Sequence, residues 1–266
     1  MGIEKLQSFF RIKGVNKEGN KLIQREKRKY LWLRSLSLFT KKNYYSLGEG
    51  LTKPVIANSN GLFYCREKSL DLHIISDSYE FNVKKLFENL SKESKVIVDI
   101  GANIGRYTVL GGINSQAKIY SIEPEEDNFR ILSKNVKLNN LNNIELFKIA
   151  LGNKKGNAKL YKDCDSRNYG GHSLKIKRKD FDIVKLDTFD NLFKDKVKKI
   201  DLVKIDVEGF ELDVLKGMKV FLSENKIKNI ILEIDKENCS TIIALLKKYG
   251  YSVKHIMYNN YLARCN

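Results

Sequence analysis

A glycine-containing segment between a predicted strand and a predicted helix constrains the fold of this chain more than any other feature. The strand is the continuous apolar run Val96–Ile100, which is typical of a strand buried on both faces. It contains Asp99 and is followed by Gly101, Asn103 and Gly105. Glycine is needed where a backbone turns tightly or where a ligand approaches the main chain. Because ligands of open α/β sheets bind at the carboxyl ends of strands, this segment predicts a ligand site.

A downstream carboxylate makes this prediction more specific. Glu123 ends the next apolar run, about 20 residues beyond the loop, where a carboxylate can accept both ribose hydroxyls of an adenosine. The spacing is not the dinucleotide fingerprint, because Asn103 stands where that fingerprint has a glycine to admit a pyrophosphate. S-adenosylmethionine has no phosphate and carries an amino group, which acidic and amide side chains suit. The segment therefore predicts S-adenosylmethionine as cofactor rather than NAD.

Alternating strand and helix patterns continue to the C-terminus. Strands are predicted at 96–100, 118–122, 144–148, 158–161, 183–185, 201–205, 229–233 and 251–258. Helices are predicted from about 101 to 113, from Pro124 to about Asn139, and near 211–216 and 241–249. Units of this length predict an α/β, Rossmann-like fold with a mostly parallel central sheet and helices on both faces.

Residues 1–90 precede this pattern and predict an N-terminal extension. The β-like runs 55–56 and 62–65 flank the turn signal 58–61 and predict a hairpin, and 72–75 is a third β-like run. A helix is predicted at 77–90 with Asp77 or Ser78 as its cap. The chain is thus predicted to divide into a basic helical lead-in with a small β extension over 1–90 and an S-adenosylmethionine-binding catalytic domain over 91–266.

The net charge of +17 is unevenly distributed. Residues 1–45 hold twelve Lys or Arg and three Glu, whereas residues 95–150 hold seven Lys or Arg and six Asp or Glu. A basic segment attracts polyanions such as nucleic acid or an anionic membrane, although a solvated surface explains the charge equally well. Within it, the mixed charged and aromatic residues 27–34 predict either an amphipathic surface helix or a helix that caps the main domain.

Several classes of protein are disfavoured by the sequence. No apolar run reaches the roughly 18–20 residues of a transmembrane helix, and the N-terminus lacks the apolar region of a signal peptide, so we expect a cytoplasmic location. The four cysteines are far apart and form no CxxC pair, which favours reduced thiols over a zinc site or a disulfide framework. They are Cys65, Cys164, Cys239 and Cys265.

Two acids follow the strand predicted at 201–205. Asp206 and Glu208 are two residues apart and would point to the same side of an extended chain, and Gly209 then allows a sharp turn. A carboxylate pair at the carboxyl end of a strand is a candidate site for orienting or deprotonating an acceptor hydroxyl. The alternative is an acid pair that caps the following helix.

Histidines and metal ligands give weaker signals. His172 lies in a glycine-flanked loop and titrates near neutral pH, so it is a candidate base. His73 and His255 lie in β-like apolar runs, where a structural role is the default. Asp206, Glu208 and Glu233 could converge on a metal ion, but no ligand spacing supports one, and we predict no metal site.

Taken together, these motifs resemble the FkbM-type S-adenosylmethionine-dependent methyltransferases of the class I, Rossmann-like fold. The resemblance covers roughly residues 95–235. Besides Val98–Gly105 and Ile122–Pro124 it includes Ala150–Gly152, Gly170–Ser173, Leu186–Thr188 and Ile205–Glu211, of which the last is the most specific. His172 stands where the family usually has a small residue.

The resemblance also implies roles for single residues. Asp99, Gly101 and Asn103, with Gly105 in the same loop, would line the methionine end of the cofactor, and Glu123 would hold the ribose. Near the adenine would lie Asn128 and the segment around Ala150.

The family implies methylation of a hydroxyl on a sugar, a glycan or another small metabolite. The positive charge leaves two other functions open, an RNA methyltransferase and a non-catalytic nucleic-acid- or membrane-binding protein that retains the fold. No recognisable RNA-binding module and no Asn-Pro-Pro-Tyr-type motif is present, which weighs against the first. The intact loop and Glu123 weigh against the second.

Overall fold

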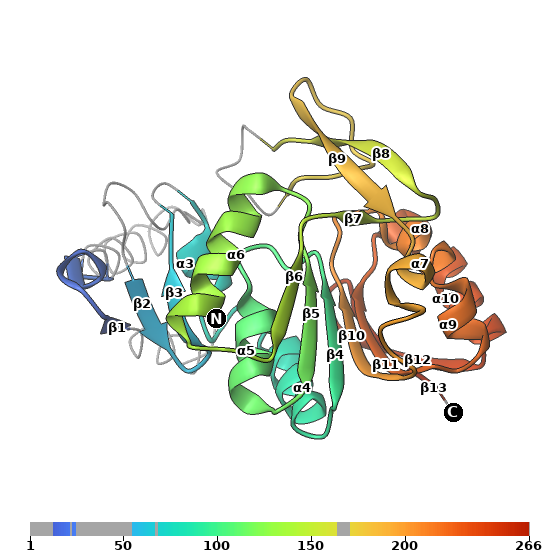
Figure 1. Cartoon of the computed structure of the whole chain (residues 1–266), viewed down its shortest axis with the longest axis horizontal. Coiled ribbons are helices and arrows are strands. Elements are labelled where there is room, and N and C mark those ends of the chain that lie inside the picture. The colour runs from blue at the N-terminus through green and yellow to red at the C-terminus, as the bar shows by residue number, and fades with distance from the viewer. Residues whose placement is uncertain (1–12, 22, 25–54, 67–68, 164–170, 266) are drawn as a thin grey trace, which may run out of the picture.

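The computed structural model describes residues 13–21, 23–24, 55–66, 69–163 and 171–265. Its centre is a seven-stranded sheet with the strand order β12-β13-β11-β10-β4-β5-β6 (Figure 1). The strands are β4 (Val96–Ile100), β5 (Lys118–Ile122), β6 (Ile144–Phe147), β10 (Ile200–Ile205), β11 (Ile227–Glu233), β12 (Tyr251–Met257) and β13 (Asn260–Cys265). Neighbours from β11 to β6 are parallel, and β13 is antiparallel to β11 and β12. The predicted mostly parallel α/β sheet is confirmed.

Helices cover both faces of this sheet (Figure 1). Successive strand residues point to opposite faces, so Ile97 packs on one side while Val98 and Ile100 pack on the other. The Ile97 side is covered by α4 (Phe81–Lys92) and α5 (Arg106–Asn114), with α6 (Glu126–Leu138) beside them. The other side is covered by α7 (Phe189–Phe193), α8 (Glu211–Lys216), α9 (Lys219–Ser223) and α10 (Cys239–Lys248). Burial on both faces explains why the strands read as continuous apolar runs.

A second, three-stranded sheet of order β7-β9-β8, here called the arm, lies at one end of the central sheet (Figure 1). Its strands are β7 (Ala150–Leu151), β8 (Gly156–Tyr161) and β9 (Phe181–Asp187). Leu160, Val184 and Leu186 form its buried face together with Ala150 and Phe210. The strands predicted at 158–161 and 183–185 therefore exist, but they belong to the arm and not to the central sheet.

The described part of the N-terminal extension packs tightly on α6. The predicted hairpin is confirmed as β2 (Val55–Asn58) and β3 (Gly61–Tyr64), and β1 (Lys13–Gly14) pairs with β2. Ile56, Phe63 and Leu72 share one apolar cluster with Ile104 of the β4–α5 loop and Ile131 of α6. The division at residue 90 stays a prediction, and the segment 27–34 lies outside the described residues.

Two elements of the extension differ from the prediction. Residues 72–75, expected to be β, form most of α3 (Asp71–Ile74), because Leu72 and Ile75 are buried at the i, i+3 spacing of a helix. The helix expected at 77–90 begins only at Phe81. Its cap is Glu80, in the left-handed region with φ 45°, and Asp77 instead forms an ion pair with Lys84 (3.1 Å).

Two elements of the region after residue 90 were also placed wrongly. Pro124 was expected to open a helix, but α6 begins at Glu126, and the Glu125 side chain caps it by accepting from the Asn128 backbone N–H (2.7 Å). The single strand expected at 251–258 is a hairpin, and its second strand β13 lies between β12 and β11. The alternation pattern had no signal for a last strand that reverses direction.

The described residues bear on two expectations about the class of protein. None of the helices found there is long and apolar enough to span a bilayer. Within the described residues Cys65, Cys239 and Cys265 form no disulfide bond, and Cys164 lies outside the described residues.

We expect Asn135 to fix the hairpin to the loop that follows β4. Its fully buried side chain accepts from the Tyr64 N–H (2.7 Å) and donates to the Ile104 carbonyl (2.8 Å). Asn135→Ala leaves both groups buried without a partner, so the free energy of unfolding measured in urea should fall by about 2–4 kcal/mol. Asn157→Ala, at an exposed position of β8, is the matched control. A loss for Asn135→Ala no larger than for the control would refute this role.

Candidate functional site

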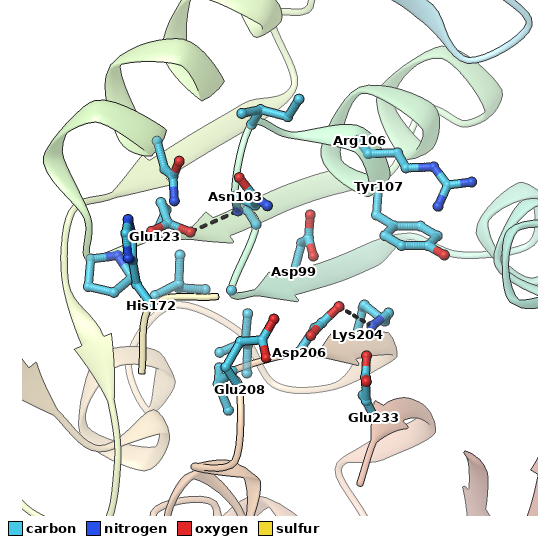
Figure 2. A pocket seen from close by; sticks show the side chains of 18 of the residues that line it. Asp99, Asn103, Arg106, Tyr107, Glu123, His172, Lys204, Asp206, Glu208 and Glu233 are labelled. Carbon is cyan, nitrogen blue, oxygen red and sulfur yellow. Dashed lines mark hydrogen bonds and ion pairs between the residues drawn. The ribbon is translucent and has the colours of Figure 1, made fainter. Parts of the chain in front are cut away.

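A pocket of about 320 Å³ opens at the carboxyl ends of β4, β5, β10 and β11, with the arm as one wall (Figure 2). It gathers most of the residues expected from the sequence, which are Asp99, Gly101, Asn103, Glu123, Asn128, Ala150, His172, Asp206 and Glu208. Gly105 does not line the pocket, because it is the cap residue of α5. His73, expected in a strand, lies in α3 and also lines the pocket.

The β4–α5 loop passes so close to β10 that Gly101 admits no side chain. Its φ is +79°, and a Cβ atom would lie 1.8 Å from the carbonyl oxygen of Asp206. The Gly101 and Ala102 N–H groups both donate to the carbonyl of Ile122 at the end of β5 (3.0 Å each). The loop is therefore held between the ends of β5 and β10, the two strands that flank β4, with its backbone facing the pocket.

The Glu123 side chain is hydrogen-bonded to the backbone of this loop. Its carboxylate accepts from the Asn103 N–H (2.8 Å) and from the Glu125 N–H (2.9 Å). Burial raises the pKa of Glu123 to about 7 in spite of these hydrogen bonds. Within the described residues the buried side-chain oxygen of Asn103 has no hydrogen-bond partner. A ligand with hydroxyl and amino donors would satisfy both groups.

Asn128 connects the pocket to the N-terminal extension. Its side-chain oxygen accepts from Arg66 (2.7 Å), and Arg66 forms an ion pair with the buried Asp71 (2.8 Å). Ala150 begins β7 and lines the same end of the pocket. The extension therefore supports the pocket wall, a role that the sequence did not reveal.

His172 lies beside Glu123 in the view of Figure 2, and the charges that act on it come from Glu125, Lys162, Arg66 and Asp163. Its Nδ1 accepts from the Asp163 N–H (2.9 Å). Burial lowers the pKa of His172, so the ring is neutral at physiological pH and its proton resides on Nε2. In this geometry His172 presents a hydrogen-bond donor.

The opposite end of the pocket is crowded with charge. Lys204 is fully buried, and its Nζ lies 3.1 Å from the Asp206 carboxylate. Burial alone would lower the pKa of Lys204, but the carboxylates of Asp206, Glu80 and Glu233 outweigh it and raise the pKa. Asp99 accepts from the Thr108 hydroxyl (2.6 Å), and burial raises the pKa of Asp99 to about 6.

The segment after β10 is not extended, which corrects the geometry assumed from the sequence. Glu208 has φ +51°, so it does not follow Asp206 in strand alternation, although both line the pocket. The Ser173 hydroxyl donates to the Glu208 carbonyl (2.7 Å), and the Gly209 N–H donates to the Glu211 carboxylate (3.0 Å). These contacts hold the turn in place.

Glu208 is exposed as a residue and lines the pocket from the turn after β10. Partial desolvation there and repulsion from Asp206 and Glu233 raise the pKa of Glu208.

Several further lining residues were missed by the sequence analysis, and four of them are charged or carry a hydroxyl close to the acids. These four are Glu80, Arg106, Tyr107 and Lys204. Only Lys204 had a visible signal, since it is a charged residue between the apolar Val203 and Ile205 in a strand interior. Glu80 accepts from the Tyr107 hydroxyl (2.9 Å), and that contact depends on the unusual start of α4.

The described residues contain no group of three or more His, Cys, Asp or Glu side chains arranged to hold a metal ion. The carboxyl groups of Asp206, Glu208 and Glu233 instead repel one another within one pocket.

Comparison with known proteins identifies curated relatives. Methyltransferase 1 of Beauveria bassiana is 27% identical over 60% of this chain and 74% of its own length. Hexuronic acid methyltransferase AglP of Haloferax volcanii is 30% identical over 58% of this chain, which spans only 62% of that relative.

Among solved structures, methyltransferase FkbM of Methylobacillus flagellatus is 19% identical, with a TM-score of 0.45, over 64% of this chain and 43% of that one. The Rossmann-like class I fold implied by the resemblance agrees with the observed sheet. Residues 99–253, more than half of the sequence, match the methyltransferase FkbM domain, and the chain therefore belongs to the FkbM methyltransferase family.

Proposed function

We propose that the protein transfers a methyl group from S-adenosylmethionine to a hydroxyl of a sugar, a glycan or another small acceptor. The observation that carries the proposal is a single pocket in which the Gly101–Asn103 loop and Glu123 face a cluster of carboxylates at neighbouring strand ends. Membership of the family supports the reaction class. The name of the Haloferax volcanii relative supports a sugar acceptor.

The residues present fit this cofactor. The orphaned Asn103 oxygen and the Asp99 carboxylate can accept from its amino group, while the bare Gly101 backbone lets it approach the loop. In this arrangement Asp99, Gly101 and Asn103 line the methionine end, with Gly105 holding the loop turn. Glu123 accepts from the ribose hydroxyls, and Asn128 and Ala150 lie near the adenine.

S-adenosylmethionine, when bound, supplies an electrophilic methyl group on a positively charged sulfur. The protein must then align an acceptor oxygen with the methyl group and accept the hydroxyl proton. We assign the alignment to Asp206 and Glu208, which lie at the end of β10 next to Gly101. His172, with its Nε2 proton, would contact the adenosyl side of the pocket.

The wider partners remain predictions. Within the basic segment 1–45 the structure describes only residues 13–21 and 23–24, so polyanion contact through this segment stays a prediction. The cytoplasmic location also stays a prediction.

We expect calorimetry to show binding of S-adenosylmethionine and no tighter binding of NAD. Glu123→Ala should weaken binding of S-adenosylmethionine by about 10- to 100-fold, because hydrogen bonds to a charged group contribute about 1.5–3 kcal/mol. Glu126→Ala, an exposed acid three residues away, is the control. Stronger binding of NAD than of S-adenosylmethionine would contradict the proposed cofactor.

We expect Asp206→Asn and Glu208→Gln each to lower methyl transfer by about 100-fold or more if they act in the chemical step. The assay follows label from S-adenosylmethionine into p-nitrophenyl glucuronide, p-nitrophenyl glucoside and fractionated cell extract. Cofactor affinity should change less for Glu208→Gln than for Asp206→Asn, which lies nearer the loop. Asp195→Asn, at an exposed position, is the control. Full turnover in both amide variants would mean that the active site is misplaced.

A further inference from the structure

Glu233 is a pocket residue to which the proposed reaction has not yet assigned a role. It ends β11, and the register Ile205↔Leu232 places the next residue of each strand side by side, which brings Glu233 next to Asp206. Strands in a sheet lie about 4.8 Å apart, so the two carboxyl groups share one end of the pocket. Figure 2 shows Glu233, Asp206 and Lys204 grouped there, away from His172.

The other proton acceptors in the pocket differ from Glu233 in their hydrogen bonds, their ion pairs or their place in the fold. His172 receives the Asp163 N–H on Nδ1 and carries its own proton on Nε2, so neither ring nitrogen is an open acceptor. Asp206 is paired with the buried ammonium of Lys204, so its Oδ2 atom already has a cationic partner (3.1 Å). Glu208 is exposed as a residue and is carried by the turn after β10 rather than by a strand end.

The surroundings of Glu233 keep its carboxyl basic. Repulsion from Asp206 comes first, and burial second, among the causes that raise the pKa of Glu233, and Glu80 and Glu211 add to them. Lys204 acts in the opposite direction. Glu208 and Tyr79 also face Glu233 electrostatically, and Asn260 is its neighbour on β13.

We infer that Glu233 is the general base that removes the proton from the acceptor hydroxyl, an inference that rests on the proposed function. The acceptor O–H bond breaks and its proton passes to a carboxylate oxygen of Glu233. The oxygen lone pair forms the new bond to the methyl carbon, and the carbon–sulfur bond breaks with its electron pair on sulfur. Glu233 then returns the proton to solvent when the product leaves.

This role requires that Glu233 be ionised once the cofactor is bound. A raised pKa means that the free protein holds a proton on this carboxyl cluster near neutral pH. The positive charge of the cofactor favours the ionised form, so binding should release that proton. Proton release on cofactor binding is therefore a property of Glu233 that can be measured without any acceptor.

The first experiment titrates S-adenosylmethionine into the full chain at pH 7.5 in two buffers of different ionisation enthalpy. We expect wild type to release a proton, Glu233→Gln to lose most of the release, and His172→Ala to retain most of it. Glu237→Gln, an exposed acid four residues away, is the matched control. Unchanged release in Glu233→Gln would overturn the inference.

The second experiment measures the pH dependence of single-turnover methyl transfer to whichever p-nitrophenyl glycoside accepts label. We expect Glu233→Gln to lose about 100-fold or more of the rate, together with the acidic limb of the profile, while cofactor affinity changes little. Glu233→Asp should restore part of the rate and the limb, which also controls for a variant that fails to fold. Loss of the limb in His172→Ala or Glu208→Gln, with Glu233→Gln retaining it, would assign the base elsewhere.

These outcomes separate the inference from the function on which it rests. If wild type binds S-adenosylmethionine with proton release but methylates neither the glycosides nor any extract fraction, the proposed function fails. If wild type transfers methyl groups and Glu233→Gln does so with an unchanged pH profile, only the role of Glu233 fails.

Discussion

The close approach of the β4–α5 loop to the end of β10 is the contact on which the site depends. Only glycine fits at position 101, because a Cβ atom there would meet the Asp206 carbonyl at 1.8 Å. The same approach is fixed from the other side by the Ile122 carbonyl, which accepts from two N–H groups of the loop. A ligand that binds along the loop is therefore placed directly beside the carboxylates that follow β10. This one backbone contact therefore sets the position of the loop relative to these carboxylates.

Charge in the pocket is arranged around a buried cation. Lys204 is inaccessible to solvent and paired with Asp206, and such a lysine keeps its charge only because several carboxylates surround it. The carboxylates are in excess. Burial, followed by repulsion from Asp206, raises the pKa of Glu208, whereas repulsion from Asp206, followed by burial, raises the pKa of Glu233. A cofactor that carries positive charge relieves this excess. The pocket thus favours cationic ligands before any specific hydrogen bond is considered.

The sequence predicted the elements whose signal is local. The buried strand Val96–Ile100, the glycine loop and Glu123 follow one another in the chain, and the structure places all three as expected. Features set by tertiary contacts escaped prediction. Glu80 starts α4 in a left-handed conformation that no cap rule favours, and β13 enters the sheet in reverse. Glu208 lines the pocket through a turn rather than an extended strand, so its place in the pocket was predicted by a wrong geometric argument.

The family motifs are longer than a binding site requires, because some of their residues do not face the pocket but hold its walls in place. The buried Ser173 ties the arm to the turn after β10 through the Glu208 carbonyl, and the buried Glu211 holds that turn through the Gly209 N–H. The Gly152 N–H donates to the Asp187 carbonyl within the arm (2.9 Å). Each of these contacts fixes the arm or the Asp206–Gly209 turn relative to the sheet. The pocket has one wall on the arm and its acids on the turn, so its shape depends on residues that touch no ligand.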